Sequence, residues 1–468
     1  MNNVKVGIPE FNFVRPGTYT TSASSLSILN LISEPMLRSY NGQFLPAIAQ
    51  SWQVLDEGRR WIFSLRPNIL FHDYSLFTSM DFIDRIGMAN QQLDEYEMPN
   101  PYPHYLQRVE FRIVDRLTLE AFSEDPNGDI ADFLSEILIR KPDKNGIYSI
   151  GTGPYRFEDY NPRRLLKLKR IDTSTNKFQQ YIYDNIHFKI VEDPHERFEQ
   201  LKNGDLDFVM NIDPSDESAG DDQIIWHKTV STTSIIGLLN GTTAPFNDPL
   251  ARQAINYAVD VEGFIREYLH GNAIPAASVV SPWHCGYESS LIPHEYDPDK
   301  AKQLFSRVLM PDELSINVPA SQPSEGPLIG EFIAEQLRKI GIPAKVTVHS
   351  DRKKYAQQVG EKKIGHIAVM DSSPLSTFRV LSDKISSVEK GIWWQGIVDP
   401  KADELIHEAN IEPDAAIREI RYARVIRYLN QNPHWLYLYH PIIASACRAD
   451  VHNIEQMHSG LLRFPCVW

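Results

Sequence analysis

The feature that most constrains the fold is a repeated order of helix, stop and strand along the chain. An Asp-Pro pair at 193–194 is typical of a helix start, because aspartate caps the first turn and proline fits it. That helix is predicted to end at Asn203, before a strand over 206–210. The same order recurs from 329 to 348. Units of this kind pack helices around a sheet, so the pattern predicts an α/β fold.

Other segments follow the same pattern. Strands are predicted over 4–8, 61–66 and 434–439, and further helices begin after Asp248 and Asp260. The 31 prolines are scattered between these short elements, as in a loop-rich α/β protein.

Length and charge narrow the class of protein. At 468 residues with 42% hydrophobic content, the chain exceeds the size of one core, so two or three domains are expected. Its net charge of −14 opposes binding to a phosphate backbone, which relies on Lys and Arg. The sequence therefore predicts no nucleic-acid partner.

The cysteines predict no disulfide framework, and the apolar segments predict no membrane span. Cys285, Cys447 and Cys466 form neither a disulfide framework nor a paired metal motif, and a Cys447–Cys466 bridge stays open. No run of about 18 apolar residues is present, so no membrane span is expected. The start has no signal-peptide features, so either the chain is cytoplasmic or a targeting segment was removed and Met1 added.

Catalytic and metal-binding patterns are missing from the sequence. Gly151-Thr-Gly-Pro154 is not followed by the Lys-Ser/Thr of a phosphate-binding loop and is predicted to be a structural turn. His434 and His440 are too far apart along a strand for one metal and are predicted to lie in loops or at the surface. No Gly-x-Ser-x-Gly motif is present. We therefore expect neither an enzyme nor a cofactor.

A series of short motifs runs along the chain. Their order and spacing make a comparison with known families specific. They are the segments 45–52 (Leu-Pro-Ala-Ile-Ala-Gln-Ser-Trp), 61–66, 71–73 (Phe-His-Asp), 78–83, 151–155 (Gly-Thr-Gly-Pro-Tyr), 190–209, 246–269, 296–302 and 438–441. In this series the chain resembles the bacterial extracellular solute-binding proteins of family 5, which serve importers of peptides, nickel chelates, some sugars and opines. Tyr74 stands where the family usually has glycine.

The resemblance implies a two-lobed periplasmic-binding-protein fold of type II, cluster C, with two crossing hinge strands near 233–240 and 435–439. Lobe I would hold residues 1–236 and 441–468, with an extra subdomain at about 35–149. Lobe II would hold 237–440. Such a protein is expected to be a monomer outside the cytoplasm. It would bind a small molecule in the interlobe cleft and deliver it to the membrane permease of an ABC transporter.

A second function stays open. Domains of this family also occur behind helix-turn-helix domains in cytoplasmic regulators. The start without a signal peptide and the tryptophan-bearing tail 460–468 favour such a sensor. The acidic charge, and a sequence that opens without a helix-turn-helix, oppose it.

Two stretches of lobe I correspond to family positions that reach the ligand. The loop 19–24 supplies Tyr19, Thr20 and Thr21, although serine and threonine there equally favour a helix N-cap. Arg140 lies near an arginine that meets carboxylates in nickel-chelate binders, and a guanidinium holds a carboxylate in a bidentate fork. The Lys-Pro pair that follows it slightly favours a plain surface position.

In lobe II the resemblance points to Asp371, because peptide binders use an aspartate here for the ligand's amino group. Ser373 replaces the acidic residue expected before the proline, which removes the usual peptide anchor. The Trp, Tyr and His of nickel-chelate binders are also missing.

Aromatic residues complete the predicted site. Trp393 and Trp394 are expected on an extended segment with opposite faces, one ring lining the cleft and the other in the core. Tyr437 and Tyr439 are expected to share a strand face near the hinge. Their hydroxyls would meet the ligand or bond to buried carbonyls.

Overall fold

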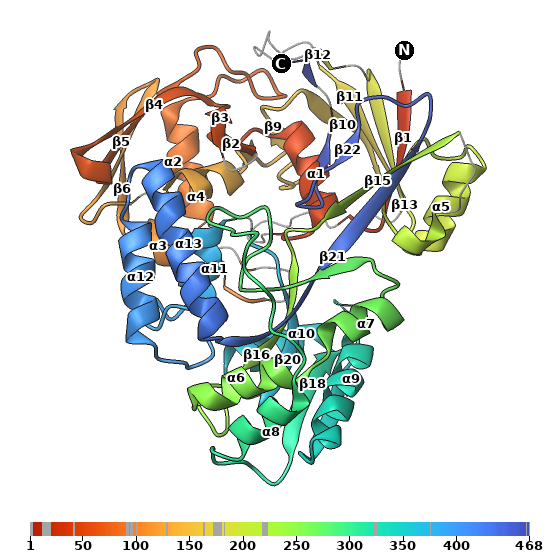
Figure 1. Ribbon diagram of the computed structural model, residues 1–468. Coiled ribbons are helices and arrows are strands. Elements are labelled where there is room, and N and C mark those ends of the chain that lie inside the picture. Colours follow the sequence, from red (N-terminus) through yellow and green to blue (C-terminus); the bar gives the residue numbers. More distant parts are fainter. Residues whose placement is uncertain are drawn as a thin grey trace. The chain divides into compact units, whose positions relative to one another are not determined.

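The structure is a computed structural model of the 468-residue chain. It describes residues 3–11, 20–40, 43–89, 93, 97–99, 102–127, 130–161, 164–171, 180–181, 183–217, 223–321, 323, 325–374, 376–464 and 466–467. The chain divides into two compact units (Figure 1). Unit 1 comprises Met1–Glu95, Asn100–Thr229 and Ile443–Trp468, and unit 2 comprises Tyr96–Pro99 and Val230–Ile442.

Unit 1 is built on a mixed sheet. Its strand order is β10 (Tyr155–Asn161), β11 (Leu165–Arg170), β13 (Asn185–Ile190), β1 (Asn3–Ile8), β14 (Phe208–Ile212) and β21 (Trp435–Arg448). Strand β1 is parallel to both β13 and β14, whereas β21 is antiparallel to β14. Helix α1 (Ala23–Ile32) covers one face and α5 (Pro194–Lys202) covers the other (Figure 1). The sheet is therefore buried on both sides, as its apolar strands require.

A second sheet of unit 1 is antiparallel. It has the order β4 (Ala49–Leu55), β5 (Arg60–Leu65), β7 (Thr118–Ser123) and β6 (Val109–Asp115). Strand β5 alternates as predicted, with Trp61, Phe63 and Leu65 buried. The helices of this region are α2 (Ser79–Ala89), α3 (Tyr102–Leu106) and α4 (Ile130–Glu136). Short two-stranded ladders pair β2 (Leu37–Tyr40) with β3 (Gln43–Pro46), β8 (Arg140–Lys141) with β9 (Ile150–Gly151), β12 (Gln180–Tyr181) with β24 (Cys466–Val467), and β22 (Glu455–Gln456) with β23 (Leu462–Arg463).

Unit 2 has its own sheet and core. The strand order is β21, β16 (Ser234–Leu239), β20 (Ile367–Ser372), β18 (Leu314–Pro319) and β19 (Ala344–His349), and β17 (Ala273–Pro275) also pairs with β21. Its core helices are α6 (Pro249–Ala258), α7 (Val261–Tyr268), α8 (Pro298–Phe305) and α9 (Gly326–Lys339). The remaining helices are α10 (Arg352–Gly360), α11 (Thr377–Lys384), α12 (Pro400–Asn410) and α13 (Ala415–Gln431), and β15 (Ile224–Val230) leads into the unit. The predicted α/β class is confirmed.

Aspartate caps explain where many helices begin. The side chains of Asp193, Asp248 and Asp260 each accept a backbone N–H in the first turn of the next helix, so the three predicted helix starts are confirmed. Asn203 ends α5, also as predicted, with its N–H on the Glu199 carbonyl.

Strand β21 is longer than the sequence predicted. It continues through Pro441 to Arg448 and pairs first with β16 in unit 2 and then with β14 in unit 1. Pro441 has no N–H to donate, but its carbonyl accepts the Ser231 N–H at 2.8 Å. The proline is thus bonded to the neighbouring segment through its carbonyl.

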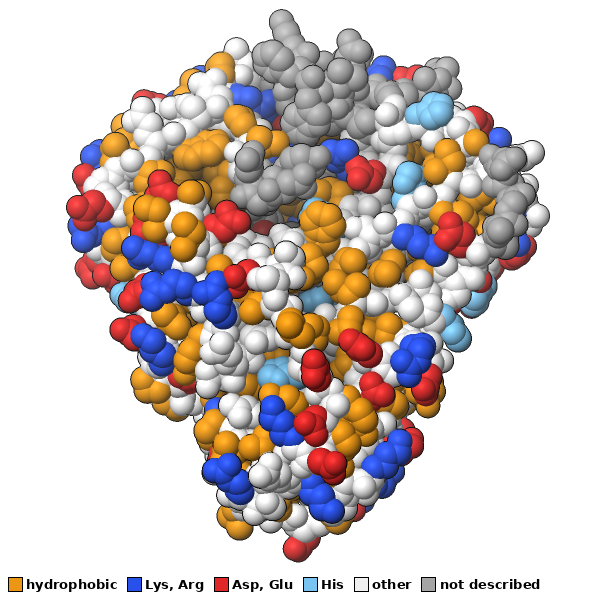
Figure 2. Space-filling model, in the orientation of Figure 1, with side chains coloured by type: hydrophobic (Ala, Val, Ile, Leu, Met, Phe, Trp, Pro, Cys, Tyr) orange, Lys and Arg blue, Asp and Glu red, His pale blue; other side chains and the backbone are white. Residues whose placement is uncertain are grey.

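Two other sequence expectations concern the cysteines and the membrane. Cys447 is a buried free thiol, so it forms no disulfide with Cys466. Within the described part of the chain, no helix is both long and apolar enough to span a membrane. Figure 2 shows acidic and basic side chains interspersed on the face drawn. Ion pairs also join α12 and α13, such as Arg424 with Glu408 at 3.5 Å.

Candidate functional site

The loop before α1 serves the helix start. Tyr19 lies outside the described residues. Ser22 is the N-cap of α1, and its hydroxyl accepts the Ser25 N–H at 3.3 Å. The hydroxyl of buried Thr20 accepts the Ser22 N–H at 3.1 Å, whereas Thr21 is exposed. The loop therefore serves as the helix N-cap, which was the alternative role considered for it. Of Thr20 and Thr21, Thr21 has the exposed side chain.

Arg140 is not a surface residue. It lies in β8 and is 7% exposed, so the surface alternative is wrong. Arg85 of α2 is equally buried, and its charge reaches Arg140. Burial, and then the repulsion from Arg85, lower the pKa of Arg140 to about 9. The sequence comparison had not singled out Arg85 as a partner of Arg140.

The Gly151–Pro154 turn is held by His72. The Gly151 N–H donates to His72 Nδ1 at 3.4 Å, so the proton of the neutral ring is on Nε2, which donates to the Gly153 carbonyl at 3.0 Å. A Cβ on residue 151 would lie 1.8 Å from the Ile32 carbonyl oxygen, which explains why this position is occupied by glycine. The turn thus has the structural role predicted for it.

Asp371 and Ser373 lie at the end of β20 in unit 2. The Asp371 side chain is 34% exposed and lies 3.4 Å from Arg352 at the start of α10. Ser373 is exposed. An accessible carboxylate that a guanidinium already faces can accept a ligand donor with its remaining lone pairs.

Next to Asp371, a polar row crosses the sheet of unit 2. Ser234 of β16 is directly opposite Ser372 of β20. The Ser234 hydroxyl lies 3.1 Å from His440 Nδ1, and Lys384 donates to the Ser372 hydroxyl at 2.8 Å. Ser234, Ser372 and His440 are buried, and Lys384 is half-buried. Burial lowers the pKa of Lys384 to about 8 and that of His440 to about 4. We name these four residues the polar row.

The two tryptophans occupy a turn and not an extended segment. The Trp394 N–H bonds to the Gly391 carbonyl at 3.0 Å, and the indole Nε1–H of Trp394 donates to the Ile397 carbonyl at 2.8 Å. Trp393 is half-buried. The predicted extended backbone is wrong here, and the Trp394 indole N–H is already bonded within unit 2.

Tyr437 and Tyr439 lie on opposite faces of β21. Their partners on β16 are the consecutive residues Ile236 and Ile235, because the register shifts between them. Tyr439 stacks on Phe264 in the core, whereas the Tyr437 hydroxyl donates to the Leu429 carbonyl at 2.8 Å. The prediction of a shared face is wrong. The hydroxyl of Tyr437 bonds to a buried carbonyl, one of the two roles considered for it.

The histidine in β21 and the one just before this strand are both buried. His440 lies within the strand and is 1% exposed, so its prediction as a loop or surface residue is wrong. His434 lies in the bend before β21, is also buried, and bonds to Asp399 at 3.1 Å. No cluster of three or more metal-ligating side chains occurs among the described residues.

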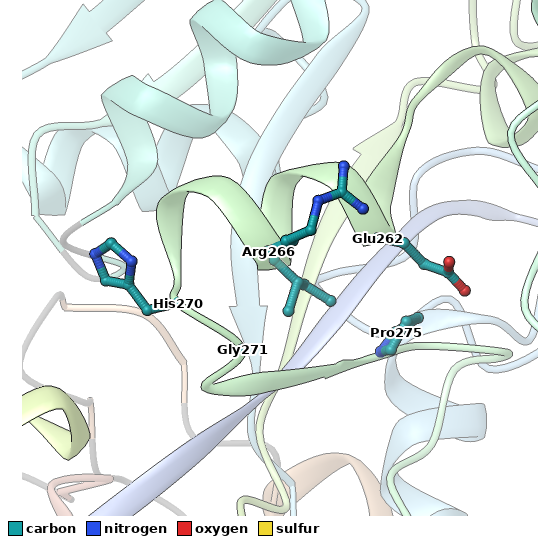
Figure 3. Close-up of a pocket in the computed structure, with 6 residues that line it drawn as sticks. Glu262, Arg266, His270, Gly271 and Pro275 are labelled. Atoms are coloured by element: carbon teal, nitrogen blue, oxygen red, sulfur yellow. The ribbon is translucent and has the colours of Figure 1, made fainter.

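An open groove of about 460 Å³ lies on unit 2 (Figure 3). Figure 3 shows Glu262 and Arg266 on α7, above Pro275 of β17. Ile265, His270 and Gly271 complete its lining. None of the predicted ligand contacts lines the groove, and its charged side chains are exposed to water.

Comparison with known proteins assigns the chain to a family. The model of the bacterial extracellular solute-binding proteins, family 5 Middle, matches residues 43–374. The chain belongs to the bacterial extracellular solute-binding proteins of family 5. The resemblance predicted from the motifs is therefore confirmed.

Family 5 relatives agree with this assignment. The chain is 27% identical over 332 residues to the glutathione-binding protein GsiB of Salmonella paratyphi A, covering 67% of this chain and 63% of that protein. It is 25% identical over 473 residues to the di/tripeptide-binding protein 2 of Pseudomonas aeruginosa, covering 92% and 87%. The match thus spans less than two thirds of the length of the glutathione-binding protein.

Solved structures confirm the fold of family 5. The periplasmic binding protein AgaA of A. tumefaciens R10, in complex with agropinic acid, matches with a TM-score of 0.81 at 19% identity. The match covers 99% of this chain and 98% of that one. The predicted periplasmic-binding-protein fold is confirmed.

Proposed function

We propose that the protein captures a small solute outside the cytoplasm and delivers it to the permease of an ABC importer. The observation that carries this proposal is the family 5 match over residues 43–374. Peptides, opines, sugars and metal chelates are the candidate solutes. The protein would act by binding and release, without chemical change of the solute.

We further propose that units 1 and 2 are the two lobes implied by the resemblance and that both supply side chains to the solute. Arg140 would contribute from unit 1, and Asp371, Ser373 and Trp393 from unit 2. Asp371 and Ser373 support this because they are accessible at the end of a strand. In open α/β sheets, ligands bind outside the carboxyl ends of the strands.

Ligand-dependent stability tests the proposal. A solute that binds only the folded protein, at 100 times its Kd, adds about 2.7 kcal/mol to the free energy of unfolding. We therefore expect at least one member of a library of peptides, opines, sugars and chelates to raise the melting temperature. Native mass spectrometry of the purified protein should reveal a co-purifying solute of the same class. An unchanged melting temperature across the library, with no bound mass, would refute solute capture.

A further inference from the structure

The end of strand β20 in unit 2 brings one carboxylate together with two cations. Asp371 is 34% exposed, and its carboxylate already faces the Arg352 guanidinium at 3.4 Å. Lys384, in the last turn of α11, donates at 2.8 Å to the hydroxyl of Ser372, the next residue of the strand. Consecutive side chains of a strand leave on opposite faces. The two cations therefore approach the strand end from both faces.

Lys384 has no carboxylate of its own. By contrast, Lys141 pairs with Asp73 at 2.6 Å, and Lys353 pairs with Glu97 at 2.5 Å. Among the described residues, Lys384 bonds to the hydroxyl of a serine and forms no ion pair with a carboxylate. An ammonium has three N–H donors, so two of them remain for a solute.

Positive charge exceeds negative charge at this strand end. The side chains that act most strongly on the charge of Lys384 are Asp371, Asp383 and Arg379. Arg379 pairs with Asp383 at 3.4 Å, so these two charges cancel. The single charge of Asp371 is then set against both Arg352 and Lys384. Although burial lowers the pKa of Lys384 to about 8, about nine-tenths of it is still protonated at pH 7.

We propose that Lys384 and Arg352 make this strand end reject a cationic amino group and accept a carbonyl or hydroxyl oxygen of the solute. This inference rests on the proposed function and narrows its ligands to solutes without an ammonium at this site, such as N-acylated peptides or sugars. An ammonium next to Asp371 would meet two like charges, which disfavour its binding. A neutral oxygen instead accepts from the two remaining N–H groups of Lys384.

Asp371 would thus differ from the aspartate that peptide binders use for the ligand's amino group. Its charge is already offset by the two cations, so it has little attraction left for a third. It can still accept a hydrogen bond from a neutral O–H or N–H donor of the solute.

Matched pairs of a free amine and its acetylated form test this exclusion. The probes are alanylalanine with N-acetyl-alanylalanine, and glucosamine with N-acetylglucosamine, measured by isothermal titration calorimetry at pH 7. We expect the acetylated form to bind about tenfold or more tightly than the amine. Any library solute that binds should likewise carry no ammonium, or bind more tightly once its amine is acetylated.

Two results are kept apart by this design. A probe or library solute that binds more tightly as the free amine than as its acetylated form would overturn the inference and leave solute capture standing. If no probe and no library member binds, the proposed function itself fails.

Three variants assign the exclusion to the charge of Lys384. Lys384→Gln keeps an N–H donor for Ser372 but loses the charge, so the free amines should bind about tenfold more tightly than they do to the wild type. Lys384→Arg keeps the charge and should keep the exclusion. Lys363→Gln removes an exposed lysine elsewhere in unit 2 and should leave it unchanged. Exclusion that persists in Lys384→Gln would overturn the role of this lysine.

The melting temperature without ligand separates this role from a structural one. Because Lys384 has no ion pair to lose, we expect Lys384→Gln to melt at or above the temperature of the wild type. A fall of several degrees would show that the lysine stabilises the fold, and the inference would then fail.

Discussion

His72 shows how one side chain fixes a turn. Its neutral ring accepts from Gly151 and donates to Gly153, which only one tautomer can do. Protonation would place a second N–H against the Gly151 N–H. Burial accordingly lowers the pKa of His72 from 6.5 to about 4.

This shift predicts a pH dependence of stability. Because the folded-state pKa is below the unfolded one, the contribution of His72 is complete above pH 6.5 and is lost as the pH falls toward 4. We expect about 2–3 kcal/mol of unfolding free energy to disappear over that range. Urea unfolding at pH 7, 5.5 and 4 measures it. The loss should be smaller in His72→Gln and unchanged in His227→Gln, which alters an exposed histidine.

Arg85 shows what the motif comparison could not find. It lies at helical spacing with buried Phe82, Ile86 and Ala89, so an arginine interrupts an apolar helix face. That signal was present in the sequence. Arg140, whose buried charge repels that of Arg85, is more than 50 positions away in sequence, and only the fold brings the two side chains together.

At the scale of elements, Asp399 joins three of them. It caps α12 through the Lys401 and Ala402 N–H groups, and it accepts from Tyr428 of α13 and from His434 before β21. These bonds outweigh the effect of burial and lower the pKa of Asp399 to about 2. One carboxylate therefore satisfies donors from all three segments.

The Asp399→Ala substitution should lower the free energy of unfolding by much more than the loss of a helix cap does. We expect about 3 kcal/mol, of which about 1 kcal/mol is the cap and the rest is due to His434 and Tyr428 left without an acceptor. Asp414→Ala is the matched control, because Asp414 caps α13 through Ala416 and Ile417. It should cost about 1 kcal/mol. Equal losses in the two variants, measured by urea unfolding, would contradict the shared role of Asp399.

Element starts were predictable because their causes are local. A helix start marked by an aspartate, or a helix end marked by a polar residue, depends on residues that are neighbours in sequence. Helices α5, α6 and α7 begin where these signals predict. The faces of Tyr437 and Tyr439 were not predictable. A register shift against β16 turns the two side chains to opposite faces of the strand. The alternation of residues along β21 alone does not indicate this shift.

At the scale of the whole molecule, each unit has a separate apolar core and β21 belongs to both sheets. Residues 435–439 pair with β16, and residues 444–447 pair with β14. The two halves of one strand are thus protected by different cores. This division was expected only from the family resemblance, because no local signal marks a boundary inside a strand.

Hydrogen exchange can separate these halves. Ile316→Ala removes a fully buried side chain of unit 2 and should weaken it by about 2–5 kcal/mol, speeding exchange at 435–439. Phe188→Ala is the counterpart in unit 1 and should speed exchange at 444–447. Equal acceleration of both halves in either variant would show that the two units unfold together.

The shared strand also sets an order of events during synthesis. All of unit 2 except residues 96–99 is encoded between the last two parts of unit 1, and the final part starts at Ile443. Strand β14 is translated more than 200 residues before the segment 444–447 that pairs with it. A nascent chain thus contains every strand of unit 2 before the final strand of unit 1 exists. We therefore expect the sheet of unit 2 to be completed before that of unit 1, the reverse of the usual order in which the amino-terminal domain folds first.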